Sequence, residues 1–163
     1  MSLRCAGALL GKKDVNDLLK LAPSLDEEVV LMDADVVCGV DHIGSAVSHA
    51  RRAFERKSNA ANTLGMEVIL YASGERQISK AKKKMGLHQG TKHIAVIVLS
   101  PEDAEVDDVL KRLGLDRDDS LLECTPEKGK AFGLGDPEIA AIGAERMQEL
   151  VLEKVAFVEL LKH

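Results

Sequence analysis

The sequence predicts a single α/β (α+β) domain over residues 1–163, a sandwich in which helices pack on one mixed or mainly antiparallel sheet. Three observations predict it. Short apolar runs rich in β-branched residues alternate with amphipathic stretches of helical period. The order of these elements follows no strict strand–helix–strand repeat. No internal repeat or low-complexity linker divides the chain, and 163 residues suffice to bury a core without disulfides or metals.

The first elements are two strands with a short helix between them. Residues 3–10 form an apolar run that predicts a strand. Asp14 is then placed to cap a short helix, which Pro23 stops. Residues 28–32 are apolar and β-branched, and they predict the second strand.

The middle of the chain predicts a long helix, a strand and a further helix. Asp41 is placed to cap a helix through residue 57, whose apolar positions form a one-sided stripe. Residues 58–64 predict a short turn, and residues 66–71 a strand. A glycine-containing turn then leads into a helix over residues 75–85.

The most hydrophobic run, residues 93–99, predicts the central strand of the sheet. Further elements follow this strand to the end of the chain. They are a helix opened by Ser100-Pro101 and closed by Gly114, a short strand at 120–124, a glycine-rich loop at 129–135, a helix from Asp136 that Gly143 breaks, and a strong helix over 145–161.

Charge is distributed unevenly along the chain. The net charge is −5, which argues against a generic nucleic-acid-binding protein. Residues 41–93 nevertheless hold ten basic and four acidic side chains, a net +6, whereas the rest of the chain carries −11. These cations fit either an ordinary solvated helix face or a local site for anions such as a phosphate backbone. Composition leaves both interpretations open.

The cysteines predict a reducing compartment. Cys5, Cys38 and Cys124 form an odd, scattered set, which is typical of reduced thiols in a cytoplasmic protein and not of a disulfide framework. The longest apolar run, residues 94–99, is too short to span a membrane, and residues 1–5 lack the features of a signal peptide. With only four aromatic residues and no Trp, a wide aromatic platform for bases is not expected.

No residue can be nominated as a catalytic base or nucleophile. Asp33 and Asp35 would share one face of a strand, so they fit either a hard-cation site or ordinary turn carboxylates. The glycine-rich residues 129–135 lack the Walker and GxGxxG spacings, which favours a plain loop. We therefore expect no catalytic residue, no metal and no cofactor.

Residues 71–78 are the most suggestive segment, because a strand-to-helix junction presents backbone N–H groups that favour anions. Arg76 would lie in the first helical turn, where a cation opposes the helix dipole. An external partner explains Arg76 better than helix stability does, and an ion pair with Glu67 or Glu75 is the alternative. Further donors follow at Gln77, Lys80, Lys83 and Lys84.

The predicted last helix carries too much apolar surface for one buried stripe. The helix is therefore either buried on two faces within the fold or has one apolar face that binds another protein. The candidate partner contacts on this helix are Leu150, Val151, Val155 and Val158.

Several of these segments together resemble one family. They are Asp33-Ala-Asp-Val-Val, the helix with His42, Ala46, His49, Ala50 and Ala53, then Asn59, the stretch Gly65-Met-Glu-Val-Ile-Leu-Tyr-Ala-Ser-Gly-Glu-Arg-Gln-Ile78, and the tail over residues 150–160. On these residues the chain is similar to the small accessory subunit of the KEOPS complex, the archaeal relatives of TPRKB, the PRPK-binding protein. The resemblance covers nearly the whole chain and is weakest over residues 111–135.

The resemblance implies a non-catalytic protein that binds the N-terminal lobe of the small atypical KEOPS kinase. It also implies capture of the single-stranded 3′ CCA end of tRNA, for a complex that installs threonylcarbamoyl on the adenosine beside the anticodon. The chemistry, ATP and metal would belong to other subunits, and self-association is left open. The expected tRNA contacts are Arg51, Arg52, Arg56, Lys57, Asn59, Tyr71, Arg76, Gln77, Ile78, Lys80, Lys83 and Lys84.

Two alternatives to this function remain. The first is a kinase-binding regulatory protein whose basic face makes no direct tRNA contact. The second is a small metal-dependent enzyme that uses Asp33, Asp35 and a histidine.

Overall fold

The computed structural model describes residues 3–143 and 146–162. The chain forms two compact units, each built from two segments. The sheet unit comprises Met1–Asp35 and Gly86–Leu122, and the helical unit comprises Val36–Met85 and Glu123–His163. Among the described residues, no helix combines the length and the apolar character needed to cross a membrane.

The sheet unit contains a four-stranded antiparallel sheet in the order β2-β3-β1-β4. The strands are β1 (Cys5–Leu9), β2 (Glu28–Asp33), β3 (His93–Ser100) and β4 (Asp116–Arg117). β3 lies between β1 and β2, and its residues from Ile94 to Leu99 are all buried, so the prediction of a central strand is confirmed. The predicted α+β class with an antiparallel sheet is confirmed as well. The extent of one domain over residues 1–163 stays a prediction.

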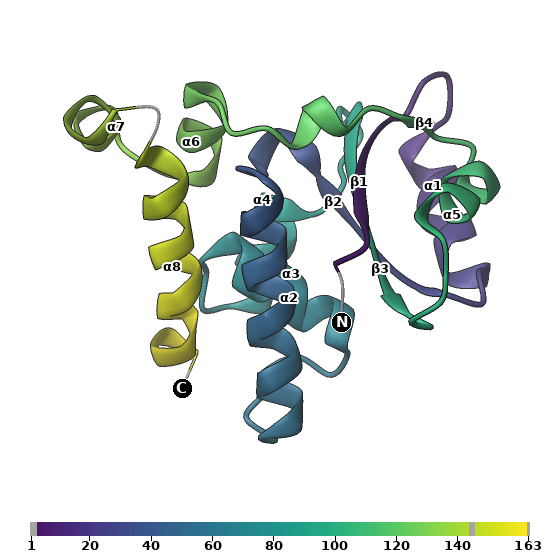
Figure 1. The fold of residues 1–163 in the computed structure, drawn as a ribbon, viewed down its shortest axis with the longest axis horizontal. Helices are drawn as coiled ribbons and strands as arrows, with labels where there is room; N and C mark the ends of the chain where they lie inside the picture. Colours follow the sequence, from purple (N-terminus) through teal and green to yellow (C-terminus); the bar gives the residue numbers. More distant parts are fainter. Residues whose placement is uncertain (1–2, 144–145, 163) are drawn as a thin grey trace. The chain divides into compact units, whose positions relative to one another are not determined.

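Two helices, α1 (Val15–Leu21) and α5 (Val106–Leu113), pack on one face of this sheet (Figure 1). Side chains of alternate residues on β1 and β3 meet the apolar faces of both helices, as strand geometry requires. The main members of this core are Ala6, Ala8, Ile94, Val96, Val98, Val15, Leu18, Val109, Leu110 and Leu113. Short 3-10 turns complete the unit: η1 (Ala22–Ser24), the first residues of η2 (Ala34–Val36), and η3 (Asp119–Leu122).

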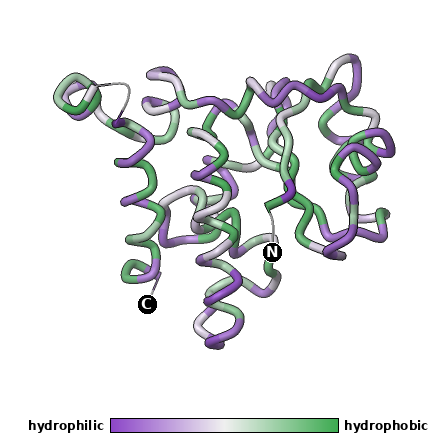
Figure 2. The backbone as a smooth tube through the Cα atoms, viewed as in Figure 1, coloured by the Kyte–Doolittle hydropathy of each residue, from purple (hydrophilic) through white to green (hydrophobic). Residues whose placement is uncertain are grey.

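The helical unit is built around α3, which packs against α2, α4 and α8. Its described helices are α2 (Val40–Glu55), α3 (Leu64–Ser73), α4 (Ile78–Met85), α6 (Pro126–Phe132), α7 (Asp136–Ile142) and α8 (Met147–Leu161). α8 also packs against α2 and α6. Figure 2 shows hydrophobic and hydrophilic residues alternating along α8, consistent with a helix that has apolar side chains on more than one face.

The predicted strand at residues 66–71 is wrong, because this segment is the helix α3. The hydroxyl of Thr63 accepts a hydrogen bond from the Met66 N–H (3.2 Å), which caps the helix. Gly74 ends α3 in the left-handed conformation, at φ 71°. A short run that is apolar all round has no period that separates a strand from a buried helix, so only these two caps indicate the correct structure.

Other predicted boundaries also need correction. α2 is capped by Gly39, not Asp41, and α4 begins at Ile78, not at residue 75. Residues 120–124 form no strand, since η3 occupies most of them. Glu105 caps α5, so Ser100-Pro101 precedes a turn and not a helix. The expected loop over residues 129–135 is wrong for residues 129–132, which belong to α6, and holds for residues 133–135, which connect α6 to α7.

Candidate nucleic-acid interface

The α3–α4 junction is held in place by a set of short local bonds. The Ser73 hydroxyl donates to the Leu70 carbonyl (2.7 Å) and accepts from the Glu75 N–H (3.0 Å). Lys84, one helix later, donates from Nζ to the Ser73 carbonyl (2.6 Å). These bonds satisfy groups at the end of α3 that the helix itself leaves unpaired. The junction is therefore an ordered platform for the residues that follow it.

Arg76 and Gln77 project from this platform into solvent. Among the described residues, Arg76 forms no ion pair, so the alternative of a partner at Glu67 or Glu75 is not what the structure contains. Lys80 and Lys83 are also exposed, on α4, whereas Ile78 is half-buried. The junction and the first turns of α4 thus present exposed cations and an amide side chain, which can bind phosphate oxygens.

Lys84 differs from its neighbours because it turns inward. Its Nζ lies 4.0 Å from the centre of the Phe132 ring and 3.7 Å from the Glu75 carboxylate. Burial lowers the pKa of Lys84, and Glu75 partly opposes that shift. These residues line an open pocket of about 410 Å³, together with Gly74, Ala131, Gly133 and Lys154.

The second predicted group of cations lies at the end of α2. Arg52, Arg56 and Lys57 are exposed, and Arg51 is half-buried. Arg52 contacts the His49 ring (3.1 Å). Asn59, also half-buried, donates from its side chain to the Ala61 carbonyl (2.8 Å), so its amide is used within its own loop.

Tyr71 does not supply a stacking surface for a base in this structure, because it is fully buried. Its ring stacks on His49, with 5.2 Å between the ring centres, and the Lys162 ammonium lies 4.5 Å above it. Burial, together with the nearby Glu159 carboxylate, raises the pKa of the Tyr71 hydroxyl. The position that sequence analysis assigned to RNA contact is therefore part of the core.

A buried ion pair beside Tyr71 was not predicted. The Glu67 carboxylate accepts from Lys162 Nζ (2.6 Å) and from the backbone N–H groups of Ala60 and Ala61 (3.1 and 2.9 Å). Neither charged side chain has any exposed surface. Because 95 positions separate the two residues, no local pattern could have indicated the pair.

α8 has one buried and one exposed apolar face. Of the predicted partner contacts, Val151, Val155 and Val158 are fully buried within the helical unit, and Leu150 is half-buried. The large apolar residues exposed on the described part of this helix are Phe157, Leu160 and Leu161, with 57%, 72% and 45% of their surface accessible. These three residues, and not the valines, are the ones that a partner could contact.

Asp33 and Asp35 each lie beside a histidine. His88 Nε2 is 3.4 Å from the Asp33 carboxylate, and His93 Nδ1 is 2.7 Å from that of Asp35. Burial raises the pKa of Asp33. Within residues 3–143 and 146–162, no three His, Cys, Asp or Glu side chains are grouped to hold a metal ion. The four side chains therefore form two separate histidine–aspartate pairs, His88 with Asp33 and His93 with Asp35.

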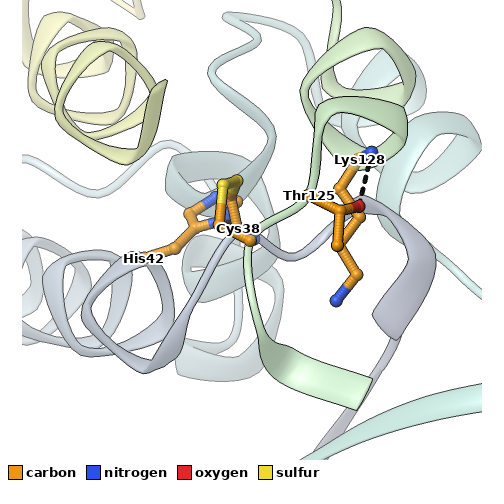
Figure 3. The surroundings of a disulfide bond; sticks show 5 residues. Cys38, His42, Thr125 and Lys128 are labelled. Carbon is orange, nitrogen blue, oxygen red and sulfur yellow. Dashed lines mark hydrogen bonds between the residues drawn. A yellow bond between two sulfur atoms is a disulfide. The ribbon is translucent and has the colours of Figure 1, made fainter. Parts of the chain in front are cut away.

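The expectation of three reduced cysteines is corrected by a disulfide between Cys38 and Cys124 (Figure 3). Their separation of 86 positions explains why spacing gave no sign of it. Cys5 is a free thiol, and burial raises its pKa to about 11. His42 lies beside the disulfide and is buried and neutral, because desolvation lowers its pKa to about 4.

Comparison with known proteins identifies the family. Residues 12–157 match the model of the kinase binding protein CGI-121 family. The regulatory protein Cgi121 of Methanocaldococcus jannaschii is 32% identical over 133 residues, which cover 81% of this chain and 83% of that protein. The resemblance drawn from the sequence is confirmed at this level: the chain belongs to the CGI-121 family.

Proposed function

We propose that this protein is a non-catalytic, cytoplasmic subunit of the KEOPS tRNA-modification complex, which binds the kinase subunit and recruits tRNA through its 3′ CCA end. The family match over residues 12–157 supports the kinase-binding part, and the relative's description as a regulatory protein fits a non-catalytic role. The observation that carries the RNA-binding part is the exposed Arg76, which lies on an ordered junction and forms no ion pair with any residue that the structure describes.

The distribution of charge between the two units favours RNA contact at the helical unit. The sequence places fourteen basic and twelve acidic residues in the helical unit, a net +2. The sheet unit holds eight basic and fifteen acidic residues, a net −7, so it would repel a phosphate backbone. The negative charge of the whole chain is thus compatible with a local cationic surface.

The chemistry of the junction fits a single-stranded RNA end better than a duplex. A flexible end can bring successive phosphates to a few cations and place unstacked base edges beside an amide such as Gln77. The half-buried Ile78 offers a small apolar contact, while the burial of Tyr71 leaves no aromatic platform there. The proposed contacts are accordingly Arg76, Gln77, Ile78, Lys80 and Lys83, with Arg51, Arg52, Arg56 and Lys57 as a second group.

A binding assay with Arg76→Glu tests the RNA contact. Fluorescence anisotropy at low, fixed salt should show that Arg76→Glu weakens tRNA binding by about tenfold, because a phosphate contact is lost and repulsion is added. Lys20→Glu, which changes charge equally on an exposed position of α1, is the matched control and should leave the affinity unchanged. Removal of the CCA end from the tRNA should weaken binding to the wild-type protein. Equal affinities for intact and shortened tRNA would contradict the proposal.

The exposed face of α8 is the surface that we assign to the kinase. Phe157 and Leu160 can be replaced together by serine without opening the core, because both side chains are largely exposed. Calorimetric titration with the kinase subunit should show at least about tenfold weaker binding, since truncated apolar contacts at an interface centre commonly cost this much. Glu153→Ser, on an exposed position of the same helix, is the control. Unchanged kinase affinity in the double variant would show that the kinase binds a different surface of the protein.

The second candidate function is kinase binding without direct tRNA contact. The exposed apolar face of α8 favours it, because that face requires only a protein partner. The two candidates differ in the tRNA assay alone: a kinase-only regulator would show the same weak affinity for tRNA with and without its CCA end.

A further inference from the structure

The two cysteines of the disulfide differ in their exposure to solvent. Cys38 precedes α2 and is fully buried, whereas Cys124 lies between η3 and α6 and is partly exposed. Figure 3 shows the disulfide beside His42, with Thr125 and Lys128 at the start of α6. A small thiol could therefore reach the sulfur of Cys124 before that of Cys38.

His42 connects this disulfide to the end of α3. The Cys38 N–H donates to His42 Nδ1 (2.9 Å), which fixes the hydrogen of the neutral ring on Nε2. His42 Nε2 then donates to the Ala72 carbonyl (2.7 Å). Phe132 of α6 also packs against His42. The two rings meet edge-on, with 5.4 Å between their centres. One buried side chain thus contacts the backbone of Cys38 and the last turn of α3.

The end of α3 is the base of the junction that carries Arg76. Ala72 precedes Ser73, whose hydroxyl and carbonyl fix Glu75 and Lys84. A displacement of Cys38 would shift the His42 ring, which accepts a hydrogen bond from the Cys38 N–H. The shifted ring would in turn displace the Ala72 carbonyl, to which it donates. The contacts are continuous from the disulfide to the junction, so a displacement at one end can be passed to the other.

We propose that the Cys38–Cys124 pair is a reversible redox brace, opened and closed by exchange with a small thiol–disulfide couple, and that His42 transmits its state to residues 73–77. In the disulfide state Cys38 is held against α6, and the junction is ordered. In the dithiol state the Cys38 backbone is released and the junction becomes more mobile. The effect of this change on RNA affinity rests on the proposed function, whereas the brace and its coupling to the junction do not.

The exchange is a balanced two-electron reaction. A thiolate, for example from glutathione, attacks the Cys124 sulfur, forms a mixed disulfide and releases Cys38 as a thiolate, which takes up a proton. A second thiolate then attacks the sulfur of the first small thiol, releases Cys124 as a thiolate, which takes up a proton, and yields the oxidised small-molecule disulfide. The protein pair gains two electrons and two protons, and two small thiols are oxidised.

Mass spectrometry in glutathione buffers of graded ratio tests the exchange step. The protein is equilibrated in each buffer in its folded state, quenched with acid and then unfolded for alkylation, which should detect only Cys5 after oxidising buffer and all three cysteines after reducing buffer. Cys5→Ser is the control and should leave the midpoint of the titration unchanged. A pair that stays oxidised in reducing buffer, or stays reduced in oxidising buffer, would overturn the proposal.

Hydrogen exchange in the two redox states tests the coupling without reference to RNA. Reduction should speed amide exchange at residues 73–77 by about threefold to tenfold, while residues 151–161 of the same unit keep their protection. His42→Leu should abolish the difference between the redox states at the junction. Equal exchange at residues 73–77 in both states of the wild-type protein would refute the coupling.

Anisotropy with tRNA completes the test. We expect the reduced protein to bind tRNA about threefold to tenfold more weakly than the oxidised protein. Two results together would refute the proposed RNA function and still support the redox brace. In the first, neither redox form binds intact tRNA more tightly than tRNA without its CCA end. In the second, amide hydrogen exchange at residues 73–77 still depends on the redox state.

Discussion

Replacement of Glu67 by alanine should destabilise the helical unit severely. The Glu67 carboxylate, which has no exposed surface, is the acceptor for three donors: Lys162 Nζ, at 2.6 Å, and the N–H groups of Ala60 and Ala61, at 3.1 and 2.9 Å. Removal of one partner of a buried ion pair leaves an uncompensated charge, which costs about 3–5 kcal/mol. The free energy of unfolding of a native protein is only about 5–15 kcal/mol, so Glu67→Ala should lower it by a large fraction.

Two further variants separate the charge from the hydrogen bonds. Glu67→Gln keeps an acceptor for the two backbone N–H groups but leaves the Lys162 ammonium without a counter-charge. Combining Glu67→Gln with Lys162→Met removes that ammonium and keeps an apolar stem over the Tyr71 ring. The two replacements contact each other, so their effects should not add. We expect the double variant to lose about 1–3 kcal/mol less than the sum of the single variants.

Urea denaturation followed by circular dichroism measures these free energies by linear extrapolation. The ranking expected is Glu67→Ala as the least stable, followed by Glu67→Gln, with the double variant less destabilised than additivity predicts. A loss below about 1 kcal/mol for Glu67→Ala, or strict additivity in the double variant, would refute the view that this pair holds α8 to α3.

Two other perturbations have calculable outcomes. Burial lowers the pKa of His42 in the folded protein to about 4, below the ordinary histidine value of 6.5, so its contribution to stability is complete above pH 6.5 and is lost as the pH falls towards 4. Urea titrations should therefore show up to about 3 kcal/mol lost over this range, and an unchanged pH slope in His42→Leu would contradict the assignment. Gly7→Ala should lower the stability of the sheet unit by about 1–3 kcal/mol, because a Cβ there would lie 2.4 Å from the Asp118 carbonyl oxygen. Gly135→Ala, with nothing closer than 3.6 Å, should change thermal stability little, and equal shifts in melting temperature would refute the steric argument.

Sequence patterns predicted β1, β2 and β3 because their signals are local, but they missed the two-residue strand β4. β3 has six consecutive buried apolar residues, and β1 and β2 are bounded by polar or turn-forming residues. Helices with a clear stripe, such as α2 and α5, were also predicted, although their N-caps were misplaced by two and five positions, respectively. α3 was missed because Val68, Ile69 and Tyr71 favour strands by intrinsic propensity, and packing on three neighbouring helices overrides that preference.

The candidate site was only partly predictable, for a related reason. The exposure of Arg76 follows from local information, since Gly74 ends one helix and Ile78 begins the next. The burial of Tyr71, the Glu67–Lys162 pair and the Cys38–Cys124 bond all depend on residues far apart in the chain. On α8 the composition revealed two apolar faces, but not which of them the helical unit buries.

α3 is the element on which both proposed functions depend. Near its N-terminus, Glu67 holds Lys162 and so the end of α8 that bears the exposed apolar face. At its C-terminus, the Ala72 and Ser73 carbonyls accept from His42 and Lys84 and so fix the junction before α4. Surface variants should therefore separate the functions: Arg76→Glu should weaken RNA binding alone, and the Phe157/Leu160 double variant kinase binding alone. Glu67→Ala should weaken kinase binding first, since α8 is the helix it releases. Greater loss of RNA binding than of kinase binding in that variant would place the kinase surface away from α8.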